Sequence, residues 1–255
     1  MDWANRRRII YAATLAIILI AYVIYSFRDI FFPAPTCFDK AMNGYETGVD
    51  CGGTCSLKCN SEVVPLVTQW TTYIKTGTTT YDLVAMIANK NIDNAPYSID
   101  YVFTVSDKNG RVLTRRNSST IVPVNSDFPI IVQNVNLPPT SMTVSIDIPK
   151  ANHYQTFEKA DKPTIKVINS SFENGPISRV YVTIQNTKLD SVDNIPVRVV
   201  LYDVNQNTIG VGETKVDRIL AEEQKNVVFT WNFQFKENPA LIKVYPIVNP
   251  FVSHN

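Results

Sequence analysis

Residues 180–209 read VYVTIQNTKLDSVDNIPVRVVLYDVNQNTI, and this stretch decides the fold of the chain. Within it, residues 180–185 and 197–202 place an apolar side chain at every second position. A period of two residues is typical of β-strands that have one face in a core. The pattern therefore predicts a strand, a polar loop, a second strand and a hairpin turn that begins at Asp203.

The same pattern occurs earlier in the chain, at residues 83–113, which read LVAMIANKNIDNAPYSIDYVFTVSDKNGRVL. Ile87-x-Asn89 aligns with Ile184-x-Asn186, and Asp107 aligns with Asp203. The spacing from the Asn to the Asp is 18 residues in the first copy and 17 in the second. We interpret the two stretches as a degenerate internal repeat, with each copy part of one antiparallel sandwich of ~90 residues.

The sequence thus predicts a mainly β protein with two tandem Ig-like antiparallel β-sandwiches, at residues 62–149 and 164–250. Residues 229–235, FTWNFQF, alternate most clearly and predict a half-buried strand of the second sandwich. Residues 150–163 contain Lys, Asp and Pro without periodicity, so we predict a linker there.

An N-terminal membrane anchor is predicted from residues 9–27, IIYAATLAIILIAYVIYSF, which contain no charged side chain. At ~1.5 Å per residue, such a helix covers about 28 Å, close to the hydrocarbon thickness of a bilayer. The residues that define the anchor are Arg6, Arg7, Arg8, Ile9 and Phe27. The positive-inside rule keeps residues 1–8 in the cytoplasm and places the bulk of the chain outside the plasma membrane, after a single span at residues 9–28.

A cleaved signal peptide is the alternative interpretation of this segment, since it shares the basic start. Its apolar part is usually only ~7–15 residues long and is followed by an A-x-A-like site. No such site follows here. The sequence therefore favours an uncleaved signal-anchor.

All four cysteines, Cys37, Cys51, Cys55 and Cys59, lie in a short module at residues 36–60. Four thiolates could hold a structural zinc, but zinc sites usually use two short-spaced pairs. Since the predicted topology places the module in an oxidising compartment, an even number of cysteines favours two disulfides. Three pairings are compatible with the sequence, which does not choose among them.

The cysteine module also contains four oxygen-bearing side chains, Asp39, Asn43, Glu46 and Asp50, among the glycines of residues 44–53. Ca²⁺ binds six to eight oxygens, and glycines allow a loop to turn its carbonyls inward. Turn capping by Asp and Asn explains the same residues without an ion. Calcium is the one cofactor that the sequence suggests.

The composition excludes several classes of function. With 24 Lys+Arg against 23 Asp+Glu, the net charge is +1, so we expect no nucleic-acid partner. The two histidines, His153 and His254, leave little room for His-based catalysis. No nucleophile elbow, phosphate-binding loop or zinc-protease motif occurs, and Gly210-Val211-Gly212 is interpreted as a turn or bulge. We therefore expect the protein not to be an enzyme.

The strand residues 199–203, VVLYD, and their counterpart 103–107, FTVSD, resemble the signature strand of bacterial FxLYD and late-embryogenesis-abundant-like Ig-type sandwiches. The cysteine module, in the form C-x-D…N-G-x-E-T…D-C-G-G-x-C, resembles a segment of uncharacterised bacterial single-pass membrane proteins with tandem domains of this type. The resemblance covers nearly the whole chain. It implies an architecture and a location in the cell envelope, and it implies no catalytic residues.

We expect a membrane-anchored extracytoplasmic structural or interaction protein that presents two β-sandwich domains for protein or cell-wall contacts. Its expected partners are the lipid bilayer, through residues 9–28, and proteins or polymers of the cell envelope. The alternative is an envelope module that binds Ca²⁺ or another ligand through the acidic, Gly- and Cys-rich segment.

Overall fold

The computed structural model describes residues 3–28, 36–140, 142–150, 153–156 and 165–248. About 53% of the residues are in strands and 11% in a helix, which confirms a mainly β fold. The chain divides into two compact units, Met1–Cys55 and Ser56–Asn255. We describe each unit by itself.

The first unit begins with a single long helix, α1 (Trp3–Ser26). Its segment Asn5–Ser26 has 22 residues and is apolar enough to cross a membrane. The hydroxyl of Thr14, near the middle of this segment, donates to the carbonyl of Ile10 at 3.0 Å, so it needs no external partner. The predicted anchor residues 6–9 lie in the first turns of α1, and Phe27 directly follows the helix.

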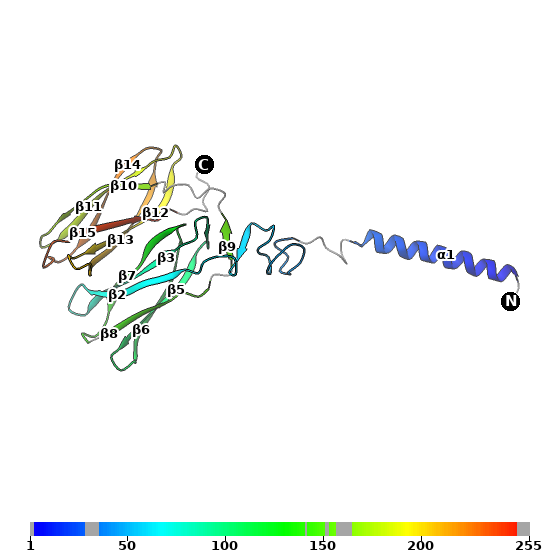
Figure 1. The fold of residues 1–255 in the computed structure, drawn as a ribbon, viewed down its shortest axis with the longest axis horizontal. Helices are drawn as coiled ribbons and strands as arrows, with labels where there is room; N and C mark the ends of the chain where they lie inside the picture. Colours follow the sequence, from blue (N-terminus) through cyan, green and yellow to red (C-terminus); the bar gives the residue numbers. More distant parts are fainter. Residues whose placement is uncertain (1–2, 29–35, 141, 151–152, 157–164, 249–255) are drawn as a thin grey trace. The chain divides into compact units, whose positions relative to one another are not determined.

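The second unit contains two six-stranded antiparallel sandwiches (Figure 1). Sandwich 1 has one sheet in the order β2-β3-β7 and one in the order β6-β5-β8. Its strands are β2 (Val67–Lys75), β3 (Thr80–Asn89), β5 (Ile99–Asp107), β6 (Val112–Thr120), β7 (Ser126–Asn136) and β8 (Met142–Asp147).

Sandwich 2 repeats this strand order with sheets β10-β11-β14 and β13-β12-β15. Its strands are β10 (Ile165–Glu173), β11 (Ser178–Asn186), β12 (Val192–Tyr202), β13 (Thr208–Ile219), β14 (Gln224–Trp231) and β15 (Leu241–Pro246). Strand for strand, β10 corresponds to β2, β11 to β3, and β12 to β5. The internal repeat in the sequence is therefore a repeat of the whole sandwich topology.

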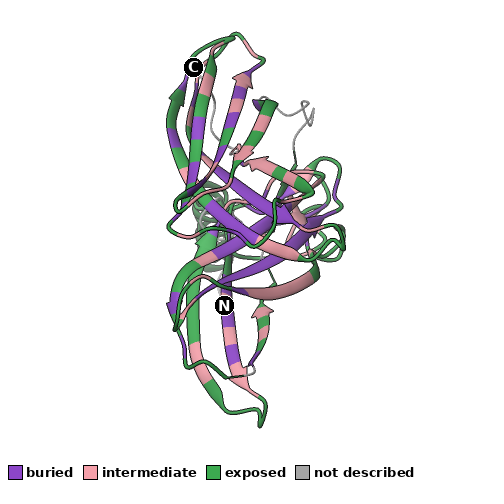
Figure 2. Cartoon of the chain, turned by 90° about the vertical axis from the view of Figure 1, so that its left-hand side faces the viewer, coloured by how far each residue is buried: buried purple, intermediate pink, exposed green. Residues whose placement is uncertain are grey.

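Each sandwich closes around its own apolar core, and Figure 2 shows buried residues in purple along the strands of both. The alternating residues of the sequence supply these cores, because every second side chain of a strand faces the opposite sheet. Full burial of one such aliphatic side chain stabilises the fold by ~1.5–3 kcal/mol. The core of sandwich 1 includes Leu83, Ala85, Ile87, Phe103 and Val105, and that of sandwich 2 includes Val180, Ile184, Val197, Leu201 and Phe229.

The repeated asparagine has the same role in both copies. Asn89 and Asn186 are 1% and 0% exposed. Each side-chain NH₂ donates to two loop carbonyls, at 2.9–3.0 Å for Asn89 and 2.7–3.0 Å for Asn186. Each side-chain oxygen accepts the backbone N–H two residues further on. A buried amide satisfied in this way holds the end of its strand against two loops.

The repeated aspartate starts the same turn in both copies. Asp107 Oδ1 accepts the backbone N–H groups of Asn109 and Arg111, at 2.8 and 3.0 Å. Asp203 Oδ1 accepts two N–H groups at the matching positions, each at 2.8 Å. Both aspartates are hairpin-turn residues, as the spacing predicted.

A small third sheet joins β1 (Leu57–Cys59), β9 (His153–Thr156) and β4 (Asn94–Ala95) in the order β1-β9-β4. Strand β9 lies inside the stretch 150–163, which the sequence predicted to be a linker. The backbone of β9 pairs with β1 on one side and β4 on the other. Because both partners are distant in sequence, the local composition of residues 150–163 did not indicate a strand. Residues 151–152 and 157–163 of that stretch lie outside the described residues, as does His254.

Candidate functional site

The cysteine module is closed by disulfides, as predicted. Cys37 and Cys55 are bonded to one another, with their Cα atoms 5.7 Å apart. Cys51 and Cys59 are also disulfide-bonded, and no cysteine is free. The sulfurs therefore provide no thiolate for zinc. Sequence spacing left the pairing open because disulfide formation depends on the distance between Cα atoms, which only the folded turns determine.

Two of the predicted calcium ligands, Asp39 and Asp50, accept hydrogen bonds from the module's own backbone. Both carboxylate oxygens of Asp50 lie 3.0–3.1 Å from the N–H of Lys40. Asp39 accepts the N–H of Ala41 at 3.0 Å and the side-chain amide of Asn43 at 2.8 Å. The hydrogen bond from Asn43 is the main reason that the pKa of Asp39 lies below its ordinary value.

The third carboxylate, Glu46, accepts the backbone N–H of Asn43 at 3.2 Å. Its other oxygen lies 3.5 Å from the sulfur of Cys55, beside the Cys37–Cys55 disulfide. Turn bracing thus accounts for all three carboxylates among the described residues. Calcium binding by Asp39, Asn43, Glu46 and Asp50 stays a prediction.

A third buried apolar cluster, besides the two cores, lies where the sandwiches meet, and we call this surface the seam. Seven buried apolar residues form it, from β2, β3 and β7 on one side and from β12 and β13 on the other. They are Ile74, Val84, Met86, Ile131, Val200, Tyr202 and Val211, with Trp70 and Tyr245 packed against them. The rings of Trp70 and Tyr202 meet edge to face with centroids 6.5 Å apart.

A buried arginine crosses the seam beside this apolar cluster. Arg198, on β12, is 6% exposed. Its Nε donates to Glu213 Oε2 at 2.8 Å within sandwich 2. Its two terminal nitrogens donate into sandwich 1, to the carbonyl of Pro129 at 2.7 Å and to the hydroxyl of Thr120 at 3.0 Å. The planar guanidinium thus ties one sandwich to the other with partners on all three nitrogens.

Two phenols at the edge of the seam have raised pKa values. Burial raises the pKa of Tyr202, and burial together with its contact with Tyr202 raises that of Tyr245. Both hydroxyls therefore stay neutral at physiological pH and act as hydrogen-bonding groups within the contact.

The seam was not predicted from the sequence, although the two strands that form its centre carry a signal for it. Alternation in β3 and β12 assigned one face of each strand to a core and the other to solvent. In the structure β3 is buried at nine of its ten positions, and β12 is buried from Val197 to Tyr202. Near-continuous apolar runs, such as LVAMIA at 83–88, are typical of strands that are covered on both faces.

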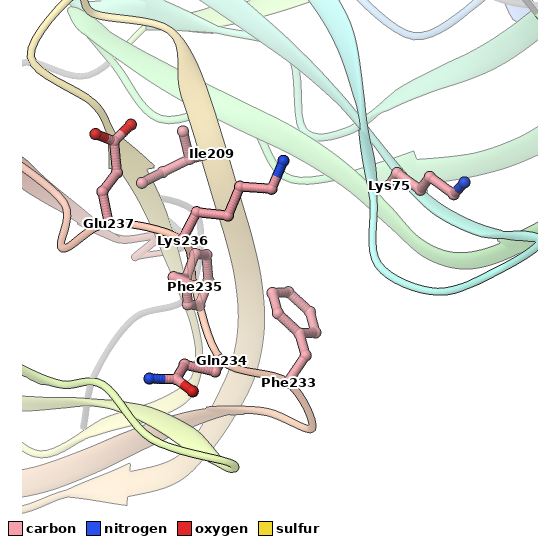
Figure 3. Close-up of a pocket in the computed structure, with 7 residues that line it drawn as sticks. All are labelled: Lys75, Ile209, Phe233, Gln234, Phe235, Lys236 and Glu237. Atoms are coloured by element: carbon pink, nitrogen blue, oxygen red, sulfur yellow. The ribbon is translucent and has the colours of Figure 1, made fainter.

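A pocket of about 310 Å³ lies next to the seam (Figure 3). Its apolar wall comes from Ile209, Phe233 and Phe235 of sandwich 2. Two lysines line it from opposite sandwiches, Lys75 at the end of β2 and Lys236 after β14. Gln234 and Glu237 complete the lining. Figure 3 shows Lys236 extending toward the side of the pocket on which Lys75 lies.

Comparison of the sequence with protein-family models and with curated proteins gives no match. Solved structures match weakly. They include a GH2 β-galacturonidase from Eisenbergiella tayi (8% identity, TM-score 0.18, 58% of this chain and 28% of that chain). Another is β-glucuronidase 2 from Bacteroides uniformis (10% identity, TM-score 0.20, 69% of this chain and 23% of that chain). A third is the CBM22-1-CBM22-2 tandem domain of Paenibacillus barcinonensis Xyn10C (10% identity, TM-score 0.15, 87% of this chain and 93% of that chain).

The chain spans about a quarter of the length of the two glycosidases, 28% and 23%. At these TM-scores and identities, the likenesses support no statement about function.

Proposed function

We propose that the chain is a membrane-anchored extracytoplasmic interaction protein whose two sandwiches together present one rigid surface to a protein or cell-wall partner. The seam is the observation that carries this proposal. Tandem domains joined by small contacts move relative to one another. A buried apolar cluster with a crossing arginine instead holds the two sandwiches in one arrangement. A fixed arrangement is what a binding surface built from both domains needs.

Under this proposal, α1 crosses the plasma membrane once, with the basic N-terminus in the cytoplasm and the sandwiches outside. The apolar segment Asn5–Ser26, which carries no charge from Ile9 onward, supports a span, and Arg6, Arg7 and Arg8 at its start support the orientation.

The strand edges of the sandwiches are the part of the surface best suited to a protein partner. In the described part of the chain, β6 pairs with β5 alone, and its residues Arg115–Ser119 are all exposed. Its unpaired backbone groups can accept a further strand from a partner. Arg115 and Arg116 on this edge favour a partner strand with acidic side chains.

Photo-crosslinking in intact cells tests the proposal. A photoreactive phenylalanine analogue replaces Arg116 on the β6 edge of the full chain. The matched control carries it at Tyr181, which is 41% exposed but lies on the central strand β11. We expect discrete adducts from position 116 that protease added outside the cells removes. Equal adduct patterns at both positions, or none at position 116, would contradict a partner at this edge.

A second candidate function, binding of an anionic ligand, is favoured by the pocket beside the seam. Its volume of about 310 Å³ reaches the lower end of the range typical of small-molecule sites. Lys75 and Lys236 contribute two ammonium groups against one carboxylate, that of Glu237, beside the ring of Phe233. A sugar acid would place its ring on the aromatic wall and its carboxylate between the lysines.

Calorimetric titration with N-acetylmuramic acid tests this second function, with N-acetylglucosamine as the matched sugar that lacks the lactyl carboxylate. We expect heat from the acid only, weakened by salt and lost in K75Q/K236Q. The control variant K166Q removes an exposed lysine of β10 that does not line the pocket. Equal heats from both sugars would exclude recognition of the carboxylate.

A further inference from the structure

The cysteine module exposes three large apolar side chains within eight residues. Phe38 is 75% exposed, Met42 is 61% exposed and Tyr45 is 83% exposed. Single exposed apolar residues are ordinary on soluble proteins, but a high density of them on a small surface marks a contact site. Here they occupy a module that is too small to bury them in a core of its own.

The module is braced, so these side chains cannot easily turn inward. The Cys37–Cys55 disulfide closes residues 37–55 into a ring. The N–H of Lys40 is held by Asp50, and that of Asn43 is held by Glu46. Because these braces lie before, between and after Phe38, Met42 and Tyr45, they hold the backbone that carries the three exposed side chains.

The same hydrogen bonds reduce the cost of moving the module's carboxylates from bulk water to a lipid surface. The carboxylates of Asp39, Glu46 and Asp50 accept hydrogen bonds from the module's own N–H groups. A carboxylate solvated in this way by the protein depends less on bulk water than a free one does. Tyr is enriched at the headgroup level of membranes, and Phe is common on the apolar face of segments that lie in the interface.

The position of the module in the chain limits how far it can lie from a membrane. Only seven residues, 29–35, separate Arg28 from Thr36. Even a fully extended chain of this length reaches no more than about 28 Å, at ~3.5 Å per residue. The module therefore stays within about 28 Å of the outer end of α1, close enough to reach the headgroup layer wherever α1 spans a bilayer.

We infer that Phe38, Met42 and Tyr45 dock the cysteine module onto the outer surface of the membrane that α1 spans, with their side chains in the headgroup region. This inference rests on the membrane anchor of the proposed function. The module then provides a second contact with the bilayer, in addition to α1. The partner of these three side chains is the lipid interface itself.

Quenching by brominated lipids tests the inference on the full chain in vesicles of phosphatidylcholine brominated near the headgroup. The variant F38W places a reporter in the module. The variant L189W places one in sandwich 2, at a residue that is 81% exposed. The wild type provides the signal of Trp3, Trp70 and Trp231, which is subtracted. Y45W is a second module reporter, in case F38W perturbs the fold.

If the module docks, the fluorescence added by F38W or Y45W falls by roughly half or more, as for groups ~5–10 Å inside the interface. The fluorescence added by L189W stays unchanged. If the wild type co-floats with the vesicles in a density gradient but both module reporters stay unquenched, the docking inference is wrong and the membrane anchor is retained. If the wild type does not float, the anchor fails, and the docking fails with it.

Discussion

Two arginine–carboxylate pairs across the same two strands show what burial adds to an ion pair. Arg198 faces Glu213, and Asp193 faces Arg218, both between β12 and β13. The side chain of Arg198 is 7% exposed and that of Glu213 is 37% exposed, whereas those of Arg218 and Asp193 are 61% and 36% exposed. Exposed pairs contribute little because water and salt screen them. The guanidinium of Arg198 is buried, and the carboxylate among its three hydrogen-bond acceptors is that of Glu213, so its charge depends on this partner.

We predict that Glu213→Gln lowers the free energy of unfolding by about 1–3 kcal/mol, because it removes a charged hydrogen-bond acceptor from buried Arg198. Asp193→Asn, the control in the same strand pair, should have a clearly smaller effect. Urea denaturation of the full chain in detergent measures both. Equal losses would show that Arg198 is solvated well enough to need no carboxylate.

Asp82 is a buried carboxylate, 2% exposed, at a β-bulge of β3. Burial raises its pKa above 3.8, although the N–H of Asn134, at 2.9 Å, partly offsets the rise. Between pH 3.8 and the raised native pKa, the native state binds more protons than the unfolded chain does. Stability from this group is therefore highest at low pH and is lost as the pH rises through that window.

Asp82→Asn should remove this loss while the amide oxygen keeps the hydrogen bond from Asn134. We expect the variant to gain stability relative to the wild type between pH 3 and pH 7. Urea denaturation at both values measures the difference. A stability difference that is the same at both pH values would contradict a raised pKa.

At the scale of elements, the packing of β13 explains why residues 210 and 212 are both glycine. They lie in a strand beside a bulge at its pairing with β12, between Leu201 and Tyr202. A Cβ on Gly212 would lie 2.9 Å from the ring of Phe229 and 3.2 Å from Val199. Glycine is required because the aromatic rings of the opposite sheet press against this backbone.

We predict that Gly212→Ala destabilises the protein by about 1–3 kcal/mol through overpacking. Gly175→Ala is the matched control, because the nearest atom to its new Cβ would lie 3.9 Å away. The thermal unfolding midpoints of both variants test this. An unchanged midpoint for Gly212→Ala would mean that Phe229 can move aside without cost.

Sequence alone predicted the elements whose cause is local. The long helix α1, the alternating strand β11 and the turns at Asp107 and Asp203 follow from periodicity, length and turn chemistry. The strand predicted at residues 229–235 was wrong beyond Trp231, where β14 ends. Phe233 and Phe235 still pack against the core of sandwich 2, but from the segment that follows the strand. Neither the disulfide pairing nor strand β9 could be predicted in this way. Both depend on which distant segments meet, and that is a property of the closed fold.

At the scale of the whole molecule, the two repeats differ at the positions that form the seam. Aligned on Asp107 and Asp203, Val200 and Tyr202 of β12 correspond to Thr104 and Ser106 of β5. On the other side of the seam, Val84 of β3 corresponds to Tyr181 of β11, on the alignment of Asn89 with Asn186. On β12, which meets sandwich 1, apolar side chains thus stand where β5 carries Thr104 and Ser106.

This difference shows how the seam could have been predicted: by comparing the repeats with each other instead of reading each strand by itself. It also indicates that the arrangement is head to tail. Sandwich 1 contributes the sheet β2-β3-β7, whereas sandwich 2 contributes β13-β12-β15, the counterpart of the other sheet of sandwich 1. The outer face of β10-β11-β14, the counterpart of β2-β3-β7, exposes the neighbouring side chains of Tyr181 and Val228 instead of burying them in a contact.

The comparison of the repeats leads to a variant that should open the seam without unfolding either sandwich. V200T/Y202S gives β12 the residues that β5 already carries at the same positions. We expect it to weaken the interaction free energy between the sandwiches by about 3–5 kcal/mol, because it truncates a buried aromatic ring and places a hydroxyl in the apolar cluster.

Scanning calorimetry of the full chain tests the seam variant. The wild type should unfold its two sandwiches in one transition, and V200T/Y202S should split this into two, because domains that lose their contact unfold independently. The reciprocal variant T104V/S106Y changes the matching positions of β5, outside the seam, and should keep one transition. A single transition in V200T/Y202S at an unchanged midpoint would show that Arg198, with its bonds to Pro129 and Thr120, holds the sandwiches together without the apolar cluster.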